Sequence, residues 1–125
     1  MKEFKRLTVR EKAHVLTLAI YSATAHFPKE EIYGLRSQMR RCSSSVPANI
    51  AEGCGRTGNG EFHRFLNIAA GSAFELEYFI LLSRDLGSIS PQVQETLVRD
   101  THEVQPMLGS LLRNVETSRR GTVNA

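Results

Sequence analysis

Apolar residues recur along this chain at intervals of three and four positions, and this spacing limits its fold more than any other feature. Such spacing places side chains on one face of an α-helix. No stretch alternates apolar and polar residues in the Val/Ile/Thr-rich context of a half-buried strand. We therefore predict an all-α protein. The four apolar stripes are Val9, Ala13, Leu16, Ile20, Ala23 and Phe27; Ile32, Leu35, Met39, Cys42, Val46, Ile50 and Gly53; Phe62, Phe65, Leu66, Ala69, Ala73, Leu76 and Ile80; and Val93, Leu97, Val104, Leu108, Leu111 and Val115.

Capping residues, prolines and glycines separate the stripes and predict where each helix begins and ends. Thr8 and Asn59 are the expected N-caps of the first and third helices, and Ser90 is that of the fourth. Gly87 follows the third stripe as a C-cap glycine. The expected helices are 8–26, 28–53, 59–85 and 90–116.

Two prolines fall inside expected helices. Pro47 has no N–H group and should leave the carbonyl of Ser43 without its helical donor. The serines at 43–45 are candidates to satisfy a freed carbonyl. Because the stripe stays in phase through Pro47, a kink is favoured over a break. Pro106 predicts a second kink, or a break near His102.

The chain of 125 residues fits one domain, residues 1–125, with a polar tail from about 117. Short connections make neighbouring helices antiparallel, so we predict an up-down-up-down four-helix bundle. No uninterrupted apolar run is long enough to cross a bilayer, and no secretory leader is visible. Two cysteines do not form a disulfide framework. We expect a cytoplasmic protein with no membrane partner.

Three patterns of catalytic or metal chemistry fail on context. Gly53 to Gly58 matches G-x-G-x-x-G, but a helix precedes it where a dinucleotide site needs a strand. Glu11 and His14 give one Glu-x-x-His pair, whereas a di-iron bundle needs two. The serines and Cys42 have no base placed beside them by spacing. We predict no enzymatic activity, no cofactor and no metal.

Charge is distributed unevenly. Residues 1–56 carry ten basic and five acidic side chains, while the third helix is acidic. Arg36 and Arg40 lie one turn apart, which favours contacts with adjacent phosphates. Arg40 or Arg41 could instead pair with an acidic side chain, Glu52 or Glu75. The candidate nucleic-acid-binding residues are Lys5, Arg6, Arg10, Lys12, Arg36, Arg40, Arg41 and Arg56.

Polar residues flank the apolar stripes of the second and third helices. Buried polar groups need hydrogen-bond partners, so these side chains should pair within one chain or across an interface between copies. A structural role is favoured over a catalytic one. The residues are Gln38, Asn49, Glu75 and Glu77.

Five strings in order carry a resemblance to a known family: FPKEE at 27–31, SQMRR at 37–41, SSVPANIAEG at 44–53, EFHRFL at 61–66 and GSAFELE at 71–77. The chain resembles the bacterial four helix bundle protein family, which includes proteins encoded in intervening sequences of large-subunit ribosomal RNA genes. It is also similar to the accessory variability proteins of diversity-generating retroelements. The resemblance covers about residues 8–115.

The resemblance implies a non-enzymatic bundle that assembles as a homopentamer. The retroelement relatives bind nucleic acid and a reverse transcriptase through basic surfaces, so the expected partners are other copies of the chain, RNA or DNA, and a reverse transcriptase if the chain belongs to a retroelement. The alternative is a scaffolding module with no nucleic-acid role, and the salt dependence of binding separates the two. Arg40 and Arg41 are also family-motif positions. The expected structural positions are Pro47, Asn49, Glu52, Gly53 and Glu75.

Overall fold

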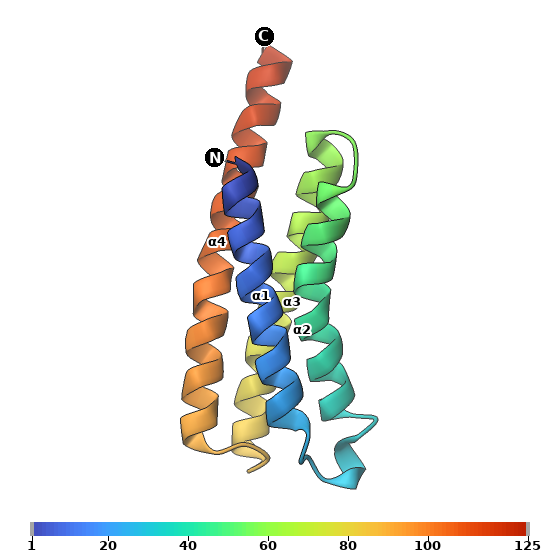
Figure 1. The fold of residues 1–125 in the computed structure, drawn as a ribbon, viewed down its shortest axis with the longest axis vertical. Helices are drawn as coiled ribbons and strands as arrows, with labels where there is room; N and C mark the ends of the chain where they lie inside the picture. Colours follow the sequence, from blue (N-terminus) through green and yellow to red (C-terminus); the bar gives the residue numbers. More distant parts are fainter. Residues whose placement is uncertain (1, 125) are drawn as a thin grey trace.

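The computed structural model describes the backbone of residues 2–124 and the side chains of residues 3 and 5–117. Its elements are α1 (Lys2–Thr24), the short 3-10 helix η1 (Lys29–Glu31), α2 (Leu35–Cys54), α3 (Asn59–Asp85) and α4 (Pro91–Asn124). The four long helices lie side by side with alternating direction, and α1 begins at the end of the bundle where α4 finishes (Figure 1). Successive helices contact each other and α1 contacts α4, while the described residues make no diagonal contact. The antiparallel four-helix bundle is confirmed.

The core follows the four predicted stripes. One buried cluster joins them, from Val9 at one end of α1 to Val115 on α4. Two predicted core positions are wrong, because Ile32 and Val93 are 37% and 39% exposed. Ile32 follows η1, before α2 begins, and Val93 lies in the first turn of α4, so neither is enclosed by neighbouring helices.

α1 begins earlier than expected. Thr8 is not an N-cap, because the helix already starts at Lys2. Lys, Glu, Arg and Leu are strong helix formers, and residues 2–7 contain no glycine or proline that would stop the helix. At its other end α1 finishes at Thr24 instead of His26.

Pro28 does not open the second helix. It precedes η1, and α2 begins only after Gly34. The backbone N–H of Leu35 donates to Glu31 Oε2 at 3.0 Å. Glu31 therefore satisfies one of the free donors at the start of α2.

The other helix ends are closer to expectation. Asn59 is the first residue of α3 and Gly58, with φ of 89°, is its N-cap. Ser90 caps α4 as predicted, since its Oγ accepts from the backbone N–H of Val93 at 3.1 Å. Gly87, with φ of 76°, follows α3 in the left-handed conformation expected of a C-cap glycine.

Both internal prolines are accommodated without a break. α2 continues through Pro47 to Cys54, and α4 continues through Pro106 to Asn124. The break considered near His102 is therefore wrong. The polar tail from about 117 is the final part of α4, which extends past the other helices in Figure 1.

α3 has the length and apolar composition of a membrane-spanning helix, by those two criteria alone. Between Arg64 and Arg84 its charged residues are Glu75 and Glu77. The expectation that no segment is apolar enough to span a bilayer therefore does not hold for α3 by this measure. In the bundle, one face of α3 packs against α2 and α4.

Candidate nucleic-acid interface

Pro47 shapes the contact between α1 and α2. Because proline lacks an N–H group, the carbonyl of Ser43 has no helical donor. Thr17 Oγ1 on α1 lies 2.9 Å from that carbonyl and 2.8 Å from the carbonyl of Ala13, so its single proton is shared between them. The expected donors, the serines of α2, bond elsewhere: Ser44 donates to the carbonyl of Arg40 at 2.8 Å. The freed carbonyl is thus satisfied across the helix pair.

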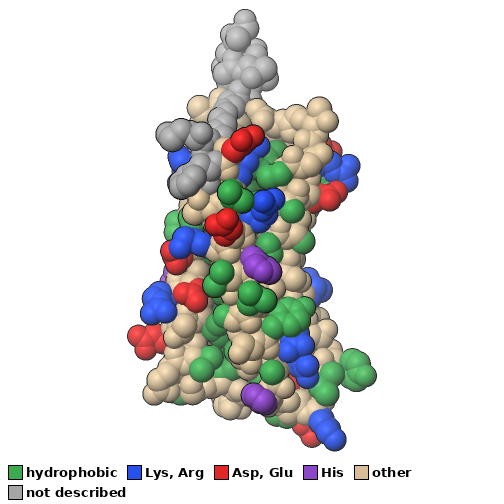
Figure 2. Space-filling view, viewed as in Figure 1, with side chains coloured by type: hydrophobic (Ala, Val, Ile, Leu, Met, Phe, Trp, Pro, Cys, Tyr) green, Lys and Arg blue, Asp and Glu red, His purple; other side chains and the backbone are tan. Residues whose placement is uncertain are grey.

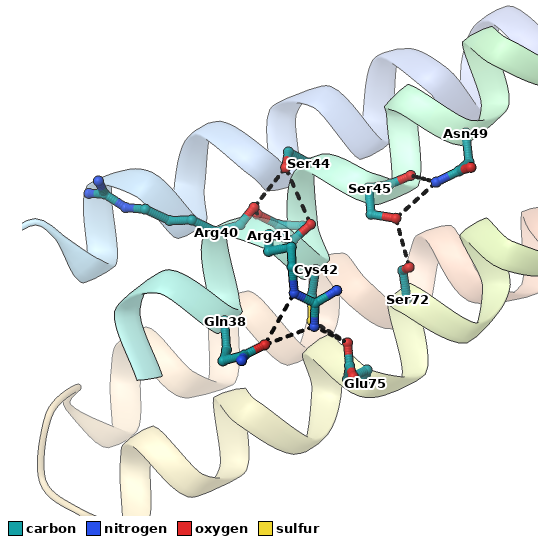
Figure 3. Close-up of polar contacts among 10 residues, drawn as sticks. Gln38, Arg40, Arg41, Cys42, Ser44, Ser45, Asn49, Ser72 and Glu75 are labelled. Carbon is teal, nitrogen blue, oxygen red and sulfur yellow. Dashed lines mark hydrogen bonds and ion pairs between the residues drawn. The ribbon is translucent and has the colours of Figure 1, made fainter. Parts of the chain in front are cut away.

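Arg40 is directed to α1. Its Nε donates to Thr24 Oγ1 at 2.9 Å and its Nη2 donates to the carbonyl of Tyr21 at 3.0 Å. The guanidinium also lies over the Tyr21 ring, 4.4 Å from the centroid. In Figure 3 it points away from the neighbouring Arg41. Arg40 holds the end of α1 against α2, and the structure does not present it beside Arg36 as a free pair of cations.

Arg41 joins α2 to α3 instead. Its Nη2 donates to Glu75 Oε1 at 2.9 Å and to Gln38 Oε1 at 2.8 Å (Figure 3). The buried Cys42 thiol donates to the same Glu75 oxygen. Burial, followed by this hydrogen bond, raises the pKa of Cys42 to about 12. The hydrogen bonds from Cys42 and Arg41 lower the pKa of Glu75. Glu75 is therefore a carboxylate that links two helices.

Asn49 supports a second polar contact between α2 and α3. Its Nδ2 donates to the carbonyl of Ser45 at 2.8 Å and to Ser45 Oγ at 2.9 Å. Ser45 Oγ lies 2.9 Å from Ser72 Oγ on α3. The three side chains form one chain of hydrogen bonds (Figure 3). We predicted that these polar side chains pair either within one chain or across an interface. Gln38, Asn49 and Glu75 have partners within one chain.

Gly53 and Arg56 lie where α2 meets the start of α3. A Cβ at Gly53 would be 3.0 Å from Phe62 Cδ1 and 3.0 Å from Phe65 Cβ, so the absence of a side chain permits this close approach. Arg56 donates to Glu52 Oε1 at 2.7 Å and lies over the Phe65 ring. Gly53 thus lies at a close helix contact and Glu52 forms an exposed ion pair, while their structural roles stay predictions.

The remaining candidate cations divide into engaged and unengaged side chains. Lys12 pairs with Glu103 on α4 at 2.5 Å. The Arg6 guanidinium lies 4.0 Å from the centre of the Phe62 ring. Among the described residues, Lys5, Arg10 and Arg36 have no hydrogen-bond or ion-pair partner. The structure does not gather all eight cations into one patch, and these last three are the ones left available to a ligand.

The contact between α3 and α4 contains polar pairs that the sequence did not reveal. Glu77 accepts from Gln105 Nε2 at 2.8 Å, and its other oxygen lies 2.7 Å from His102 Nε2. These hydrogen bonds, with Gln105 first, lower the pKa of Glu77. His63 and Glu116 form a further pair at 3.5 Å. Partners 25 or more residues apart follow from packing and leave no signal in local spacing. Among the described residues, no His, Cys, Asp and Glu side chains group as a metal site.

Large apolar side chains are exposed on two helices. On α1 they are joined by basic and histidine side chains on the face shown in Figure 2, and a groove of about 790 Å³ separates this helix from α2 around His14 and Pro47. On α3 they form a face with fewer charges. We call these sets the α1 apolar face, comprising Leu7, Val15, Leu18 and Tyr21, and the α3 apolar face, comprising Ile68, Phe74, Tyr78 and Leu81.

Comparisons with known proteins agree with the fold. The family model described as 23S rRNA-intervening sequence protein matches residues 5–110. A solved structure, that of a protein of unknown function from the S23 ribosomal protein family of Bacteroides thetaiotaomicron, is similar with a TM-score of 0.80 and 24% identity. The match covers 87% of this chain and 98% of that one. Among curated proteins there is no match.

Proposed function

The chain belongs to the 23S rRNA-intervening sequence protein family, and from this premise we propose that it is a non-catalytic, self-assembling bundle that binds the phosphate backbone of RNA or DNA in the cytoplasm. Two observations support the proposal. Apolar faces remain exposed on α1 and α3, and three cations near α1 and α2 have no partner within the described chain. The first supports assembly and the second supports binding to phosphates.

The two apolar faces support an assembly of several copies. Phe74 and Tyr78 on α3 are 61% and 58% exposed, and Val15 on α1 is 60% exposed. Exposed apolar patches of this kind mark interaction surfaces. α1 and α3 occupy diagonal positions in the bundle, so one copy's α3 apolar face can meet the next copy's α1 apolar face. Such head-to-tail contacts close into a ring when the rotation between neighbouring copies is a whole fraction of a turn, and a rotation of one fifth of a turn would give the pentamer implied by the resemblance.

Substitution at the α3 apolar face tests the assembly. Light scattering of the wild-type protein should give several times the chain mass of 14.0 kDa, whereas Leu81→Glu should shift the protein to the monomer. Leu86→Glu is the matched control, because Leu86 is equally apolar and 60% exposed but lies beyond α3. A wild-type monomer at micromolar concentration would contradict the assembly.

The unengaged cations carry the proposed binding to phosphates. Arg10 and Arg36 can turn their guanidiniums to a ligand without breaking a contact within the described chain. Arg40 and Arg41, by contrast, would first lose hydrogen bonds that hold helices together. Phosphate contacts give affinity without base recognition, so binding should be weakly dependent on nucleic-acid sequence.

The salt dependence of binding tests this role. Each lost phosphate contact should reduce the slope of log affinity against log salt by about 1. Arg10→Gln and Arg36→Gln should each do so for a single-stranded RNA and an unrelated DNA. Arg99→Gln is the matched control, because it removes the same charge from α4, where Arg99 is exposed beside Asp100. An unchanged slope in both test variants would remove the support for a phosphate-binding surface.

A scaffolding module with no nucleic-acid role is the second candidate. It is favoured by the engagement of Lys12, Arg40, Arg41 and Arg56 in contacts within the chain. An oligomer that binds no nucleic acid at low salt would support it. A reverse transcriptase encoded beside the chain would then be the partner to test, and the groove between α1 and α2 around His14 and Pro47 would be its expected binding site.

A further inference from the structure

A pocket of about 330 Å³ lies where the first turns of α1 meet the end of α2. Two arginines one helical turn apart, Arg6 and Arg10, line it together with the exposed thiol of Cys54. Among the described residues of the lining, Glu3 is the acidic one, and Leu7 is the remaining member. The pocket is thus a small, cationic depression, and it shares Leu7 and Arg10 with the lining of the larger apolar groove between α1 and α2.

Both arginines lie on α1 and, unlike Arg40 and Arg41 of α2, have donors that no described atom uses. Arg6 Nε is buried, and no described atom accepts its hydrogen. A buried donor without an acceptor is unfavourable and rare. The face of the Arg6 guanidinium is held by the Phe62 ring, 4.0 Å from its centroid. Because the ring covers one face of the guanidinium, we expect a ligand to bind through the N–H groups at its edge. Arg10, which is exposed and unpartnered in the described chain, can add a second guanidinium to the same ligand.

We propose that this pocket binds a phosphomonoester, the group found at the 5′ end of a processed RNA or DNA strand. The proposal rests on the nucleic-acid-binding function and narrows it to a strand end. A phosphomonoester carries nearly two negative charges and three acceptor oxygens near neutral pH. It therefore matches two guanidiniums, which bind phosphate oxygens through paired N–H donors. An internal phosphodiester carries one charge, and its strand must leave the pocket in two directions.

Oligonucleotides that differ only at the 5′ end test the proposal. Fluorescence anisotropy should show that a short single-stranded RNA with a 5′-phosphate binds at least about tenfold more tightly than the same RNA with a 5′-hydroxyl, the effect of one or two charge-assisted hydrogen bonds. Arg6→Gln and Arg10→Gln should each bring this ratio towards one. Arg36→Gln is the matched control: it lies at the opposite end of α2, so it should weaken both RNAs equally and preserve the ratio.

The acidic residue of the pocket gives a test of opposite sign. Glu3→Gln removes a carboxylate that repels a phosphate there, the one acidic side chain that the described lining contains, so the ratio should rise. A destabilised protein would not show this gain, and melting temperatures of all four variants identify any that fail to fold. A ratio that is unchanged in Glu3→Gln and in both arginine variants overturns the proposal.

The alkylation rate of Cys54 measures whether a ligand occupies the pocket, and this measurement needs no nucleic acid. Cys42 is buried and its pKa is raised to about 12, so iodoacetamide should react with Cys54 in the native protein. Inorganic phosphate or a 5′-mononucleotide should slow this alkylation, while the corresponding nucleoside should not. The same protection should be lost in Arg10→Gln. Equal alkylation rates with phosphate and with chloride of matched ionic strength would overturn the pocket.

The two measurements separate failure of the pocket from failure of the broader function. Equal binding of both RNAs with a steep salt slope overturns the pocket and leaves the phosphate-backbone function standing. Protection of Cys54 by phosphate without binding of either RNA supports the pocket and overturns the nucleic-acid function. If neither RNA binds and phosphate does not protect Cys54, both the pocket and the nucleic-acid function are overturned.

Discussion

At the scale of single residues, Thr17 links a backbone defect in α2 to the packing of α1. Pro47 removes the donor that Ser43 would have had, and the Thr17 hydroxyl lies 2.9 Å from the Ser43 carbonyl. Thr17 is 8% exposed, so water does not readily replace it. The proline and the threonine therefore act as a pair, although they lie on different helices.

This pairing predicts a coupling between Thr17 and Pro47. Thr17→Val should lower the free energy of unfolding by about 1–3 kcal/mol, because a buried carbonyl loses its donor. In a Pro47→Ala background the loss should be smaller, since the alanine N–H restores a helical hydrogen bond to Ser43. Urea unfolding of the four proteins of the cycle measures the coupling. Thr17→Ser, which keeps the hydroxyl, is the control, and a coupling energy of zero would refute the interpretation.

Gly53 predicts a second residue-scale effect. Gly53→Ala should destabilise the protein by about 1–3 kcal/mol, because its Cβ would be placed against Phe62 and Phe65 in a filled site. Gly60→Ala should be neutral or stabilising, because its Cβ would meet no atom within 4 Å and alanine favours the helix. Chemical denaturation of both variants decides between steric conflict and simple helix propensity. If Gly53→Ala is as stable as Gly60→Ala, the close approach is not needed.

At the scale of helices, the sequence predicted the apolar faces well and the polar contacts poorly. Leu16, Leu66 and Leu108 are buried as expected, because the interval between apolar residues alone defines a helical face. The partner of Glu77 could not be predicted, because His102 and Gln105 reach it only through the particular rotation of α4 against α3. The predicted start of α2 was wrong for a related reason. Pro28 is compatible with both a helix start and a 3-10 turn, and in the structure the 3-10 turn forms and α2 begins after Gly34.

The carboxylates of α3 predict how stability depends on pH. Hydrogen bonds lower the pKa values of Glu75 and Glu77 in the folded protein from an ordinary value of 4.5. Their contribution is therefore complete above that value and is lost as pH falls through the lower folded pKa values. Urea midpoints measured from pH 6 downwards should decline below about pH 4.5. In the double variant Glu75→Gln and Glu77→Gln this decline should be shallower than in the wild type. If the two proteins give the same urea midpoints at every pH, the contacts of Glu75 and Glu77 do not cause the decline.

At the scale of the whole molecule, the end of α4 should contribute little to stability. The last buried side chain described on α4 is that of Val115. Deleting residues 118–125 should change the free energy of unfolding by less than about 0.5 kcal/mol. Deleting residues 112–125, which removes Val115 and the partly buried Leu112, should cost about 2 kcal/mol or more. Thermal and urea unfolding of both truncations measure the difference, and equal stability of the two would contradict it.

The alternating direction of the four helices has a consequence for any cyclic assembly. The start of α1, the turn between α2 and α3 and the end of α4 lie together at one end of the bundle (Figure 1). Rotation about a symmetry axis never inverts a subunit along that axis. If the bundles stand along it, the unpaired cations Lys5 and Arg10 of every copy lie on one side of the ring, and the η1 segments lie on the other. The two ends of such a ring differ. A nucleic-acid strand would meet the ring of positive side chains from one direction only, and several strand ends could bind there at once.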